Sequence, residues 1–255
     1  MNPMSLPEVN AGERPDGRRA EELRPIRLEL GIAPAAAGSV MVHLGATRVL
    51  CAAMVEDGVP RWMREQKIEG GWLTAEYSLL PYATTGRTAR ESSTGRVGGR
   101  TMEIQRMIGR SLRAVTDLRL LGARTIWVDC DVVQADGGTR TAAISGAYVA
   151  LALALRRERA AGRLAGQPLS DSICAVSVGR VGGRALLDLC YAEDAAAEVD
   201  LNVVMTGDGR FVELQGAAER RPFSLPDLDE MLELARIGAS AWRNAQAEAL
   251  ARSDN

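Results

Sequence analysis

The segment of residues 125–160 constrains the fold of this chain more than any other. Residues 125–134 are rich in apolar and β-branched side chains and predict a strand. Residues 135–138 contain Gly137 and Gly138 and predict a turn, and residues 139 to about 160 predict a long helix. That helix opens with small side chains, which permit close packing against a sheet: Ala142, Ala143, Ser145, Gly146 and Ala147. We therefore expect this helix to lie directly on a sheet.

Strand and helix patterns flank this unit on both sides. Alternating apolar residues predict a hairpin over 38–55, and 3.6-residue spacing predicts a helix over 101–118. Ser224 to Asp227 resembles a capping box that begins a final helix ending near residue 251. A short apolar segment lies at 72–81, and strand-like segments lie at 173–178, 185–191, 199–205 and 211–214. This order predicts an α+β (mixed α/β) fold with helices covering the sheet faces.

Several segments show little apolar periodicity. Residues 82–99 are rich in Gly, Ser, Thr and Arg and predict a long exposed loop, and loops of that length are often functional. No convincing linker divides the chain, so we expect a single domain over 14–250. The other irregular segments are an expected flexible extension at 1–13, a mixed entry segment at 14–37 and a charged connection at 56–71.

The single histidine, His43, excludes several kinds of chemistry. It lies inside an alternating strand pattern, which favours a structural role. One histidine cannot build a two-histidine metal site within one chain, and a Ser–His–Asp triad would have to use His43. Chemistry in this chain is therefore expected to rest mainly on carboxylates, arginines and backbone amides.

The cysteines and the apolar runs indicate a compartment. The four cysteines are far apart and form no CxxC pair, so we expect buried, reduced thiols. No apolar run approaches the roughly 20 residues that a membrane span needs. The polar first 14 residues lack the apolar centre of a secretory signal. We expect no membrane association and a cytoplasmic location.

Charge is separated along the sequence although the net charge is only −2. Residues 82–113 carry seven arginines and two glutamates, whereas residues 188–200 carry five acids and no basic residue. Arginine supplies every positive side chain except Lys67. The planar guanidinium group suits phosphate, so the cationic segment favours a polyanionic partner. For Arg106, Arg110 and Arg113, which share one face of the expected helix, a solvated or subunit-contacting face is the alternative.

Two glycine-containing turns precede predicted helices and resemble anion sites. Gly137 and Gly138 let backbone N–H groups converge, and Thr139 and Arg140 add a hydroxyl and a full charge. The spacing is not that of a Walker loop. Strand–Gly–Gly–helix turns are also common as purely structural features. Arg100 repeats the theme after a Gly-Gly pair at the start of the other helix, which favours phosphate chemistry.

Asp188 and Asp194 supply paired carboxylates near a strand end. Close carboxylates need a cation to neutralise them, and Mg²⁺ is usually held by one or two carboxylates together with substrate phosphate oxygens. A glycosidase acid–base pair and a solvated acidic loop are the alternatives. Two cationic anion sites fit a sugar substrate poorly.

Taken together, several exact sequence blocks resemble the bacterial ribonuclease PH family. The resemblance runs in order from about residue 14 to residue 245 and covers nearly the whole chain. The blocks are residues 14–18 (RPDGR), 73–77 (LTAEY), 98–106 (GGRTMEIQR), 129–132 (DCDV), 134–141 (QADGGTRT) and 202–205 (NVVM).

The resemblance implies a fold, an activity and an assembly. The implied fold is that of ribonuclease PH, described as ribosomal protein S5 domain 2-like, with βαβα-type halves and mixed sheets covered by helices. The implied activity is phosphate-dependent 3′→5′ exoribonucleolysis (tRNA nucleotidyltransferase activity), which trims tRNA precursors, releases nucleoside diphosphates and is reversible. The implied assembly is a homo-oligomeric ring of six subunits (a trimer of dimers). A non-catalytic RNA-binding ring subunit is the alternative.

The resemblance also assigns roles to individual residues. It implies that Arg100, Gly138, Thr139 and Arg140 bind inorganic phosphate, and that Arg140 acts in catalysis. It implies that Asp188 and Asp194 are catalytic and hold Mg²⁺, with Mn²⁺ as the other possible metal. Arg87 and Arg90 match loop arginines that guide RNA. Tyr82 stands where some relatives have arginine, and a tyrosine there would stack on a base instead.

Overall fold

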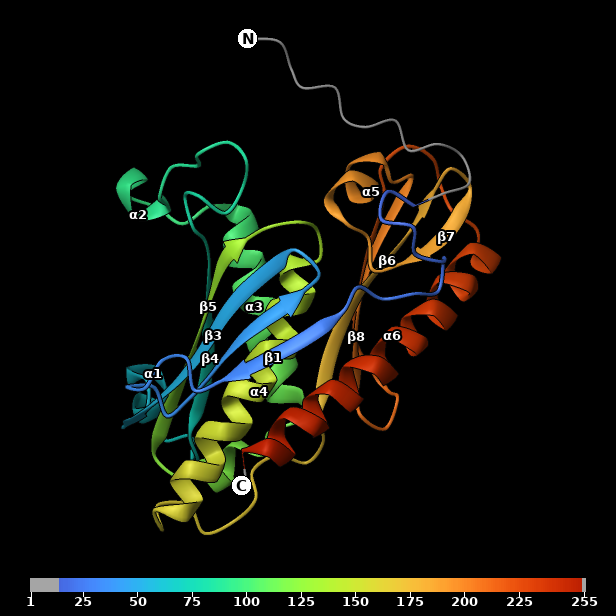
Figure 1. The fold of residues 1–255 in the computed structure, drawn as a ribbon. Coiled ribbons are helices and arrows are strands. Elements are labelled where there is room, and N and C mark those ends of the chain that lie inside the picture. Colours follow the sequence, from blue (N-terminus) through green and yellow to red (C-terminus); the bar gives the residue numbers. More distant parts are fainter. Residues whose placement is uncertain (1–13, 254–255) are drawn as a thin grey trace.

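The computed structural model describes residues 14–253, which form two β-sheets and the helices that pack on them (Figure 1). The first sheet has the strand order β1-β2-β3-β5-β4. Its pairs are antiparallel except β4 with β5, which is parallel, so this sheet is mixed as expected. Its strands are β1 (Ile26–Leu30), β2 (Gly38–Leu44), β3 (Thr47–Asp57), β4 (Trp72–Leu79) and β5 (Arg124–Gln134).

The second sheet has four strands in the order β7-β6-β8-β9. All of its pairs are antiparallel, so the expectation of mixed sheets applies to the first sheet alone. The strands are β6 (Ile173–Val181), β7 (Arg184–Leu187), β8 (Val199–Thr206) and β9 (Phe211–Ala218).

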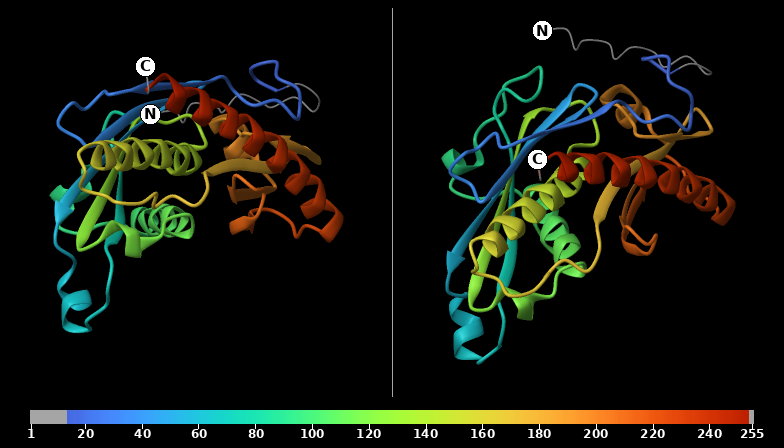
Figure 2. Two further views of the ribbon diagram at one scale, coloured as in Figure 1. Left: turned by 90° about the horizontal axis from the view of Figure 1, so that it is seen from below. Right: turned by 60° about the horizontal axis from the view of Figure 1, so that its bottom comes forward.

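Three long helices join the two sheets into one structure, as the two further views show (Figure 2). Helix α4 (Thr139–Ala160) packs on β2 and β3 and also contacts β6 of the second sheet. Helix α3 (Gly99–Ala114) packs on β4, and α6 (Leu225–Arg252) packs on β6, β7 and β1. A single hydrophobic cluster contains residues of both sheets. The shorter helices are α1 (Arg61–Glu65), α2 (Glu91–Thr94), α5 (Tyr191–Ala196) and the 3₁₀ turn Leu118–Leu121.

The predicted contact between the 139–160 helix and a sheet is confirmed. A Cβ at Gly146 would lie 2.4 Å from Val42 Cγ2 and 2.8 Å from Cys51 Sγ. On the sheet side, a Cβ at Gly38 would lie 2.3 Å from the carbonyl oxygen of Ala150. Only glycine permits an approach this close. The axis of α4 is therefore fixed against the sheet, and so is the position of its N-terminus.

Three local differences from the sequence expectations have physical causes. The entry segment contains β1, a short strand at the sheet edge in which only Leu28 is fully buried, so its apolar alternation is weak. Helix α3 ends at Ala114 rather than 118, because the chain then turns into a 3₁₀ segment capped by the Asp117 carboxylate. The strand expected over 185–191 ends at Leu187, because Asp188 adopts a positive φ of 56°.

The capping box and the state of the cysteines agree with the sequence expectations. Ser224 accepts a hydrogen bond from the Asp227 amide, and the Asp227 side chain accepts one from the Ser224 amide. All four cysteines are buried and free. Within residues 14–253, no helix is long and apolar enough to cross a bilayer. The extension expected at 1–13 lies outside the described residues.

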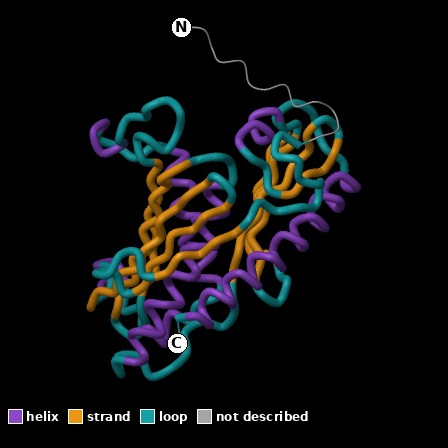
Figure 3. The backbone as a smooth tube through the Cα atoms, viewed as in Figure 1, coloured by secondary structure: helices purple, strands orange, loops and turns teal. Residues whose placement is uncertain are grey.

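Segment 82–99 is mostly loop, as expected (Figure 3); it contains the one-turn helix α2, and its last residue begins α3. It follows β4 and leads into α3. Tyr82, Arg87 and Arg90 are all exposed on it. This segment thus lies between a strand and a helix that both contribute to the site described next.

Candidate active site

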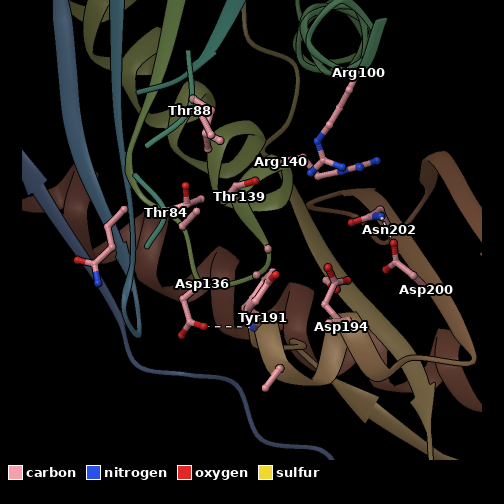
Figure 4. A pocket seen from close by; sticks show the side chains of 18 of the residues that line it. Thr84, Thr88, Arg100, Asp136, Thr139, Arg140, Tyr191, Asp194, Asp200 and Asn202 are labelled. Atoms are coloured by element: carbon pink, nitrogen blue, oxygen red, sulfur yellow. Dashed lines mark hydrogen bonds between the residues drawn. The ribbon is translucent and has the colours of Figure 1, made fainter. Parts of the chain in front are cut away.

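A cavity of about 1400 Å³ opens between the two sheets, and many of the residues singled out from the sequence line it (Figure 4). The first sheet and the helices that follow its strands supply Arg100, Gly138, Thr139 and Arg140. The second sheet and α5 supply Asp194, Asp200 and Asn202. Segment 82–99 adds Thr84, Thr85 and Thr88. The cavity therefore places Arg100 and Arg140, from the first half of the chain, opposite Asp194 and Asp200 from the second (Figure 4).

The turn before α4 is held in a conformation that requires glycine. Gly137 and Gly138 have φ angles of 72° and 65°, and Gly138 is the N-cap residue of α4. The Thr47 hydroxyl donates to the Gly137 carbonyl at 2.7 Å and accepts from the Asp136 amide at 3.0 Å. No side chain caps the first turn of α4, which leaves its backbone N–H groups to a ligand in the cavity.

Arg100 and Arg140 point toward one another across this part of the cavity (Figure 4). Arg140 Nη1 donates to Gln215 Oε1 on β9 at 2.8 Å and lies 3.8 Å from Glu103 Oε1 on α3. The Gln215 amide also donates to Glu103. The Arg140 guanidinium is thus held between the two halves, while Arg100 at the start of α3 is exposed. Two guanidinium groups beside a helix N-terminus form an anion site.

Asp194 on α5 and Asp200 on β8 are the two aspartates that face this anion site (Figure 4). Burial raises the pKa of Asp194, and the positive charges of Arg100 and Arg140 partly oppose that effect. Burial and the neighbouring Asp194 raise the pKa of Asp200 to about 6. Asn202 Nδ2 donates to Asp200 Oδ2 at 3.4 Å, whereas the buried Asp200 Oδ1 has no hydrogen-bond partner. The positive charge of Arg140 therefore only partly offsets the negative charge of the pair.

The structure does not bring Asp188 to this pair. Asp188 is buried and is not among the residues that line the cavity. Its carboxylate accepts hydrogen bonds from the Arg24 amide at 2.8 Å, from Arg24 Nε at 2.9 Å and from Arg24 Nη2 at 2.6 Å. Arg18 Nη1 donates to it at 3.2 Å. Two guanidinium groups thus already engage this carboxylate, and the role of Asp188 as a metal ligand stays a prediction.

Asp200 is the functional candidate that the sequence reasoning missed. It is the last acid of the 188–200 segment, and it lies within the expected strand over 199–205. Asp194 and Asp200 are separated by the same interval as Asp188 and Asp194, so spacing alone does not choose between the pairs. One sequence signal did point to Asp200: it is an acid inside a mainly apolar strand, two positions before Asn202.

The donor set of the Asp194–Asp200 pair fits a hard divalent cation. No group of three or more His, Cys, Asp or Glu side chains within residues 14–253 could hold a metal. Mg²⁺, however, commonly takes only one or two protein carboxylates and completes its shell with water and substrate phosphate oxygens. The two raised pKa values and the unpartnered oxygen of Asp200 agree with a site that binds a cation.

Arg87 and Arg90 do not line the cavity but lie on the exposed part of segment 82–99. Other residues of the same segment, Thr84 and Thr88 among them, face the cavity (Figure 4). His43, for which we expected a structural role, lies on β2 beside Arg27 and Glu29 and outside the cavity lining.

Comparisons with known proteins identify relatives of this chain. A model of the 3′ exoribonuclease family, domain 1, matches residues 22–157, and a model of domain 2 of that family matches residues 171–238. A relative from Saccharopolyspora erythraea named ribonuclease PH is 56% identical over 239 residues, which cover 93% of this chain and 94% of that protein. The ribonuclease PH of Bacillus subtilis is 54% identical over 241 residues, covering 94% of this chain and 98% of that protein.

Solved structures show the same fold at low sequence identity. Rice Rrp46 has a TM-score of 0.75 at 20% identity, with 93% of this chain and 99% of that chain covered. An Archaeoglobus fulgidus exosome with RNA bound to the active site has a TM-score of 0.75 at 22% identity, with 91% and 92% covered. The family models and the close relatives extend over nearly the whole described chain. This chain belongs to the ribonuclease PH family of 3′ exoribonucleases.

Proposed function

We propose that this chain is a phosphorolytic 3′→5′ exoribonuclease, a phosphate-dependent tRNA nucleotidyltransferase that trims the 3′ ends of tRNA precursors. The observation that carries the proposal is the cavity itself. There, Arg100, Arg140 and the N-terminus of α4 face the carboxylates of Asp194 and Asp200. An anion site opposite a cation site is what the transfer of a nucleotidyl group to inorganic phosphate needs.

Inorganic phosphate is expected to occupy the cationic side of the cavity. The Gly138 and Thr139 backbone at the start of α4 offers N–H donors, and Arg100 and Arg140 offer guanidinium donors. Gln215 and Glu103 hold Arg140, so the donors are arranged before the ligand arrives. Preorganised donors cost little reorganisation during the reaction, which is the main source of electrostatic catalysis.

The transfer step needs positioning rather than a strong base. An oxygen of the bound phosphate attacks the phosphorus of the last phosphodiester, and the bond from that phosphorus to the preceding 3′ oxygen breaks. The proton of the attacking hydrogen phosphate ends on that 3′ oxygen, so the products are a shortened RNA and a nucleoside diphosphate. Because a phosphodiester is exchanged for a diphosphate bond, the reverse addition of nucleotides is also expected. The absence of any histidine from the cavity lining is consistent with this route.

Asp194 and Asp200 would hold the divalent cation, Mg²⁺ or Mn²⁺, in place of the Asp188–Asp194 pair predicted from the sequence. When bound, the cation would neutralise charge on the phosphate oxygens of the two reacting groups. Asp200 on β8 supplies a buried oxygen that has no hydrogen-bond partner, and Asp194 supplies a carboxylate from α5. Asn202 orients Asp200 through its side-chain amide.

RNA is proposed to reach the cavity along segment 82–99. Arg87 and Arg90 are exposed there and would contact the backbone phosphates of a single-stranded 3′ tail. The exposed Tyr82 side chain, 65% accessible, would stack on a base. We also propose a ring of six subunits, because structures with this fold include an archaeal exosome core. We also propose a cytoplasmic location, because all four cysteines are free thiols and thiols stay reduced in that compartment.

The direct test is to incubate the protein with a 3′-tailed RNA and Mg²⁺, with and without inorganic phosphate. Nucleoside diphosphates are expected to appear only when phosphate is present. Release of nucleoside monophosphates in the absence of phosphate would show a hydrolase and would contradict the proposal. Light scattering of the purified protein measures the mass of the assembly and tests the ring independently.

A further inference from the structure

The pairing of Arg24 with Asp188 connects two parts of the chain that are 164 residues apart. Both side chains are 4% exposed. The Arg24 backbone N–H, Nε and Nη2 all donate to the Asp188 carboxylate, at 2.6 to 2.9 Å. This carboxylate also receives Arg18 Nη1, so it is neutralised by groups from a single segment near the N-terminus.

The same guanidinium reaches the turn that precedes the phosphate site. Arg24 Nη1 donates to the Asp136 carbonyl, and Nη2 lies 3.4 Å from the Gly137 carbonyl. Gly137 and Gly138 follow this contact directly, and Gly138 begins α4. Arg24 therefore holds the carbonyl side of the turn whose N–H side is proposed to bind phosphate.

The turn is also in direct contact with the segment that leads into α5. A Cβ at Gly137 would lie 2.3 Å from the Leu189 carbonyl oxygen, so the two backbones touch. The Tyr191 amide donates to Asp136 Oδ1 at 3.2 Å (Figure 4). Asp188 immediately precedes this contact and has a positive φ, which its four hydrogen bonds hold in place.

Helix α5 depends on these contacts for its position. It has six residues, too few to be stable alone in water. Its only fully buried charged side chain is Glu193, which accepts two hydrogen bonds from Arg14 at 2.7 and 2.8 Å. Arg14 Nη2 also donates to the Asp188 carbonyl at 2.9 Å. Asp194, the next residue of α5, faces the cavity.

We propose that the Arg24–Asp188 pair is a positioning device, which fixes the phosphate-binding turn relative to the helix that carries Asp194. The inference rests on the function proposed above and gives Asp188 a role in positioning. Arg24 is not proposed to contact the bound phosphate or the bound cation. It acts by spanning them, with one edge of its guanidinium on Asp188 and the other on Asp136. A displacement of about 1 Å in such a site costs on the order of a hundredfold in rate.

If the Arg24–Asp188 pair had a purely structural role, a different result would be expected. If Arg24 served only to neutralise the buried Asp188, any cation at that position would suffice. Lysine carries the charge on a compact ammonium group and lacks the planar fork that contacts both Asp188 and the Asp136 carbonyl. Arg24→Lys therefore keeps a positive charge beside Asp188 but removes the simultaneous contact with Asp188 and the Asp136 carbonyl.

The test compares Arg24→Lys with the double variant Arg24→Gln/Asp188→Asn, which leaves no unpaired buried charge and remains informative if Arg24→Lys fails to fold. Steady-state kcat and KM for phosphate are measured below the onset of unfolding. The rise in Tm that inorganic phosphate causes is measured without RNA or metal. We expect both variants to lose about tenfold to a hundredfold in kcat/KM for phosphate. We also expect a smaller phosphate-induced rise in Tm.

Glu158→Gln is the matched control. Glu158 is also buried and paired with an arginine, Arg163, but it lies at the far end of α4, roughly 28 Å along the helix from Thr139. This variant is expected to lower Tm and to keep wild-type kcat and phosphate KM. Wild-type kinetics together with an undiminished phosphate shift in Arg24→Lys or in the double variant would overturn the positioning role. Failure of the wild-type protein to form nucleoside diphosphates would instead contradict the proposed function, and the phosphate shift would still report on Arg24.

Discussion

Asp194 and Asp200 face the same cavity from α5 and β8, and the charge of Asp194 adds to burial in raising the pKa of Asp200 to about 6. The positive charge of Arg140 partly opposes this rise in pKa, and Asn202 is the hydrogen-bond partner of Asp200. In the metal-free protein this arrangement destabilises the charged form of Asp200. A divalent cation bound beside Asp200 would stabilise that charged form.

This relationship predicts how stability depends on pH. The folded protein holds the Asp200 proton up to about pH 6, whereas the unfolded chain loses it near the ordinary value of 3.8. Between these pH values the folded state therefore binds more protons than the unfolded state. The contribution of Asp200 to the free energy of unfolding falls as the pH rises through this window. Asp200→Asn removes the penalty, so without divalent metal it is expected to raise the free energy of unfolding by about 1–2 kcal/mol at pH values above 7.

The measurement is chemical unfolding of wild type and Asp200→Asn at a series of pH values, and the difference is expected to shrink as the pH falls toward 4. Asp208→Asn is the control of opposite sign, because hydrogen bonds from Arg210 and Thr206 lower the pKa of Asp208 to about 2. Its replacement is expected to lower stability at neutral pH. Equal stability of Asp200→Asn and wild type across the series would contradict the account of Asp200.

Replacing Arg140 tests the anion site. Arg140→Ala removes charge-assisted hydrogen bonds to phosphate worth about 1.5–3 kcal/mol, which corresponds to about a tenfold to hundredfold rise in phosphate KM or a comparable loss of turnover. RNA binding, measured by fluorescence anisotropy, is expected to persist. Arg61→Ala is the control, since Arg61 is exposed on α1 and pairs only locally with Glu65. An unchanged phosphate KM and turnover in Arg140→Ala would refute its role.

Tyr77 offers a test of how the start of α4 is held. Its buried hydroxyl donates to Thr139 Oγ1 at 2.9 Å, so β4 is connected to the first residue of the helix. Tyr77→Phe is expected to cost about 1 kcal/mol in the free energy of unfolding and to raise phosphate KM severalfold. Tyr148→Phe, at a buried position of α4 outside the cavity lining, should leave phosphate KM unchanged. Equal phosphate KM values for the two variants would contradict the role of Tyr77.

The exposed arginines of segment 82–99 should affect RNA rather than phosphate. The double variant Arg87→Ala/Arg90→Ala is expected to raise RNA KM and to leave phosphate KM at the wild-type value. Each lost contact to a single-stranded backbone phosphate should reduce the salt dependence of log Kd by about 0.7. Titration of a 3′-tailed RNA at several salt concentrations measures this slope. A slope identical to that of wild type would show that these arginines do not contact the RNA backbone.

Local features of the sequence predicted the core of the fold and the anion site. The strand, turn and helix over 125–160 depend on apolar periodicity and on two glycines whose positive φ angles no other residue adopts readily. Those signals are contained within a few residues of one another. The same is true of the capping box at Ser224, and both predictions are confirmed.

The carboxylate site could not be predicted in the same way. Asp188, Asp194 and Asp200 look alike in the sequence, and their roles differ because of distant partners. Arg24 and Arg18 engage Asp188 from the other end of the chain, whereas one buried oxygen of Asp200 has no hydrogen-bond partner. Pairing over 164 residues is set by tertiary structure, which neither spacing nor periodicity reports.

The central claim is that inorganic phosphate is the group that attacks the RNA, and heavy-oxygen labelling tests it most directly. The protein is incubated with a 3′-tailed RNA, Mg²⁺ and phosphate labelled with heavy oxygen, and the released nucleotides are examined by mass spectrometry. The account predicts nucleoside diphosphates that carry all of the isotopic oxygen of the phosphate and a shortened RNA that carries none. Unlabelled nucleoside monophosphates, with the label remaining in free phosphate, would contradict it.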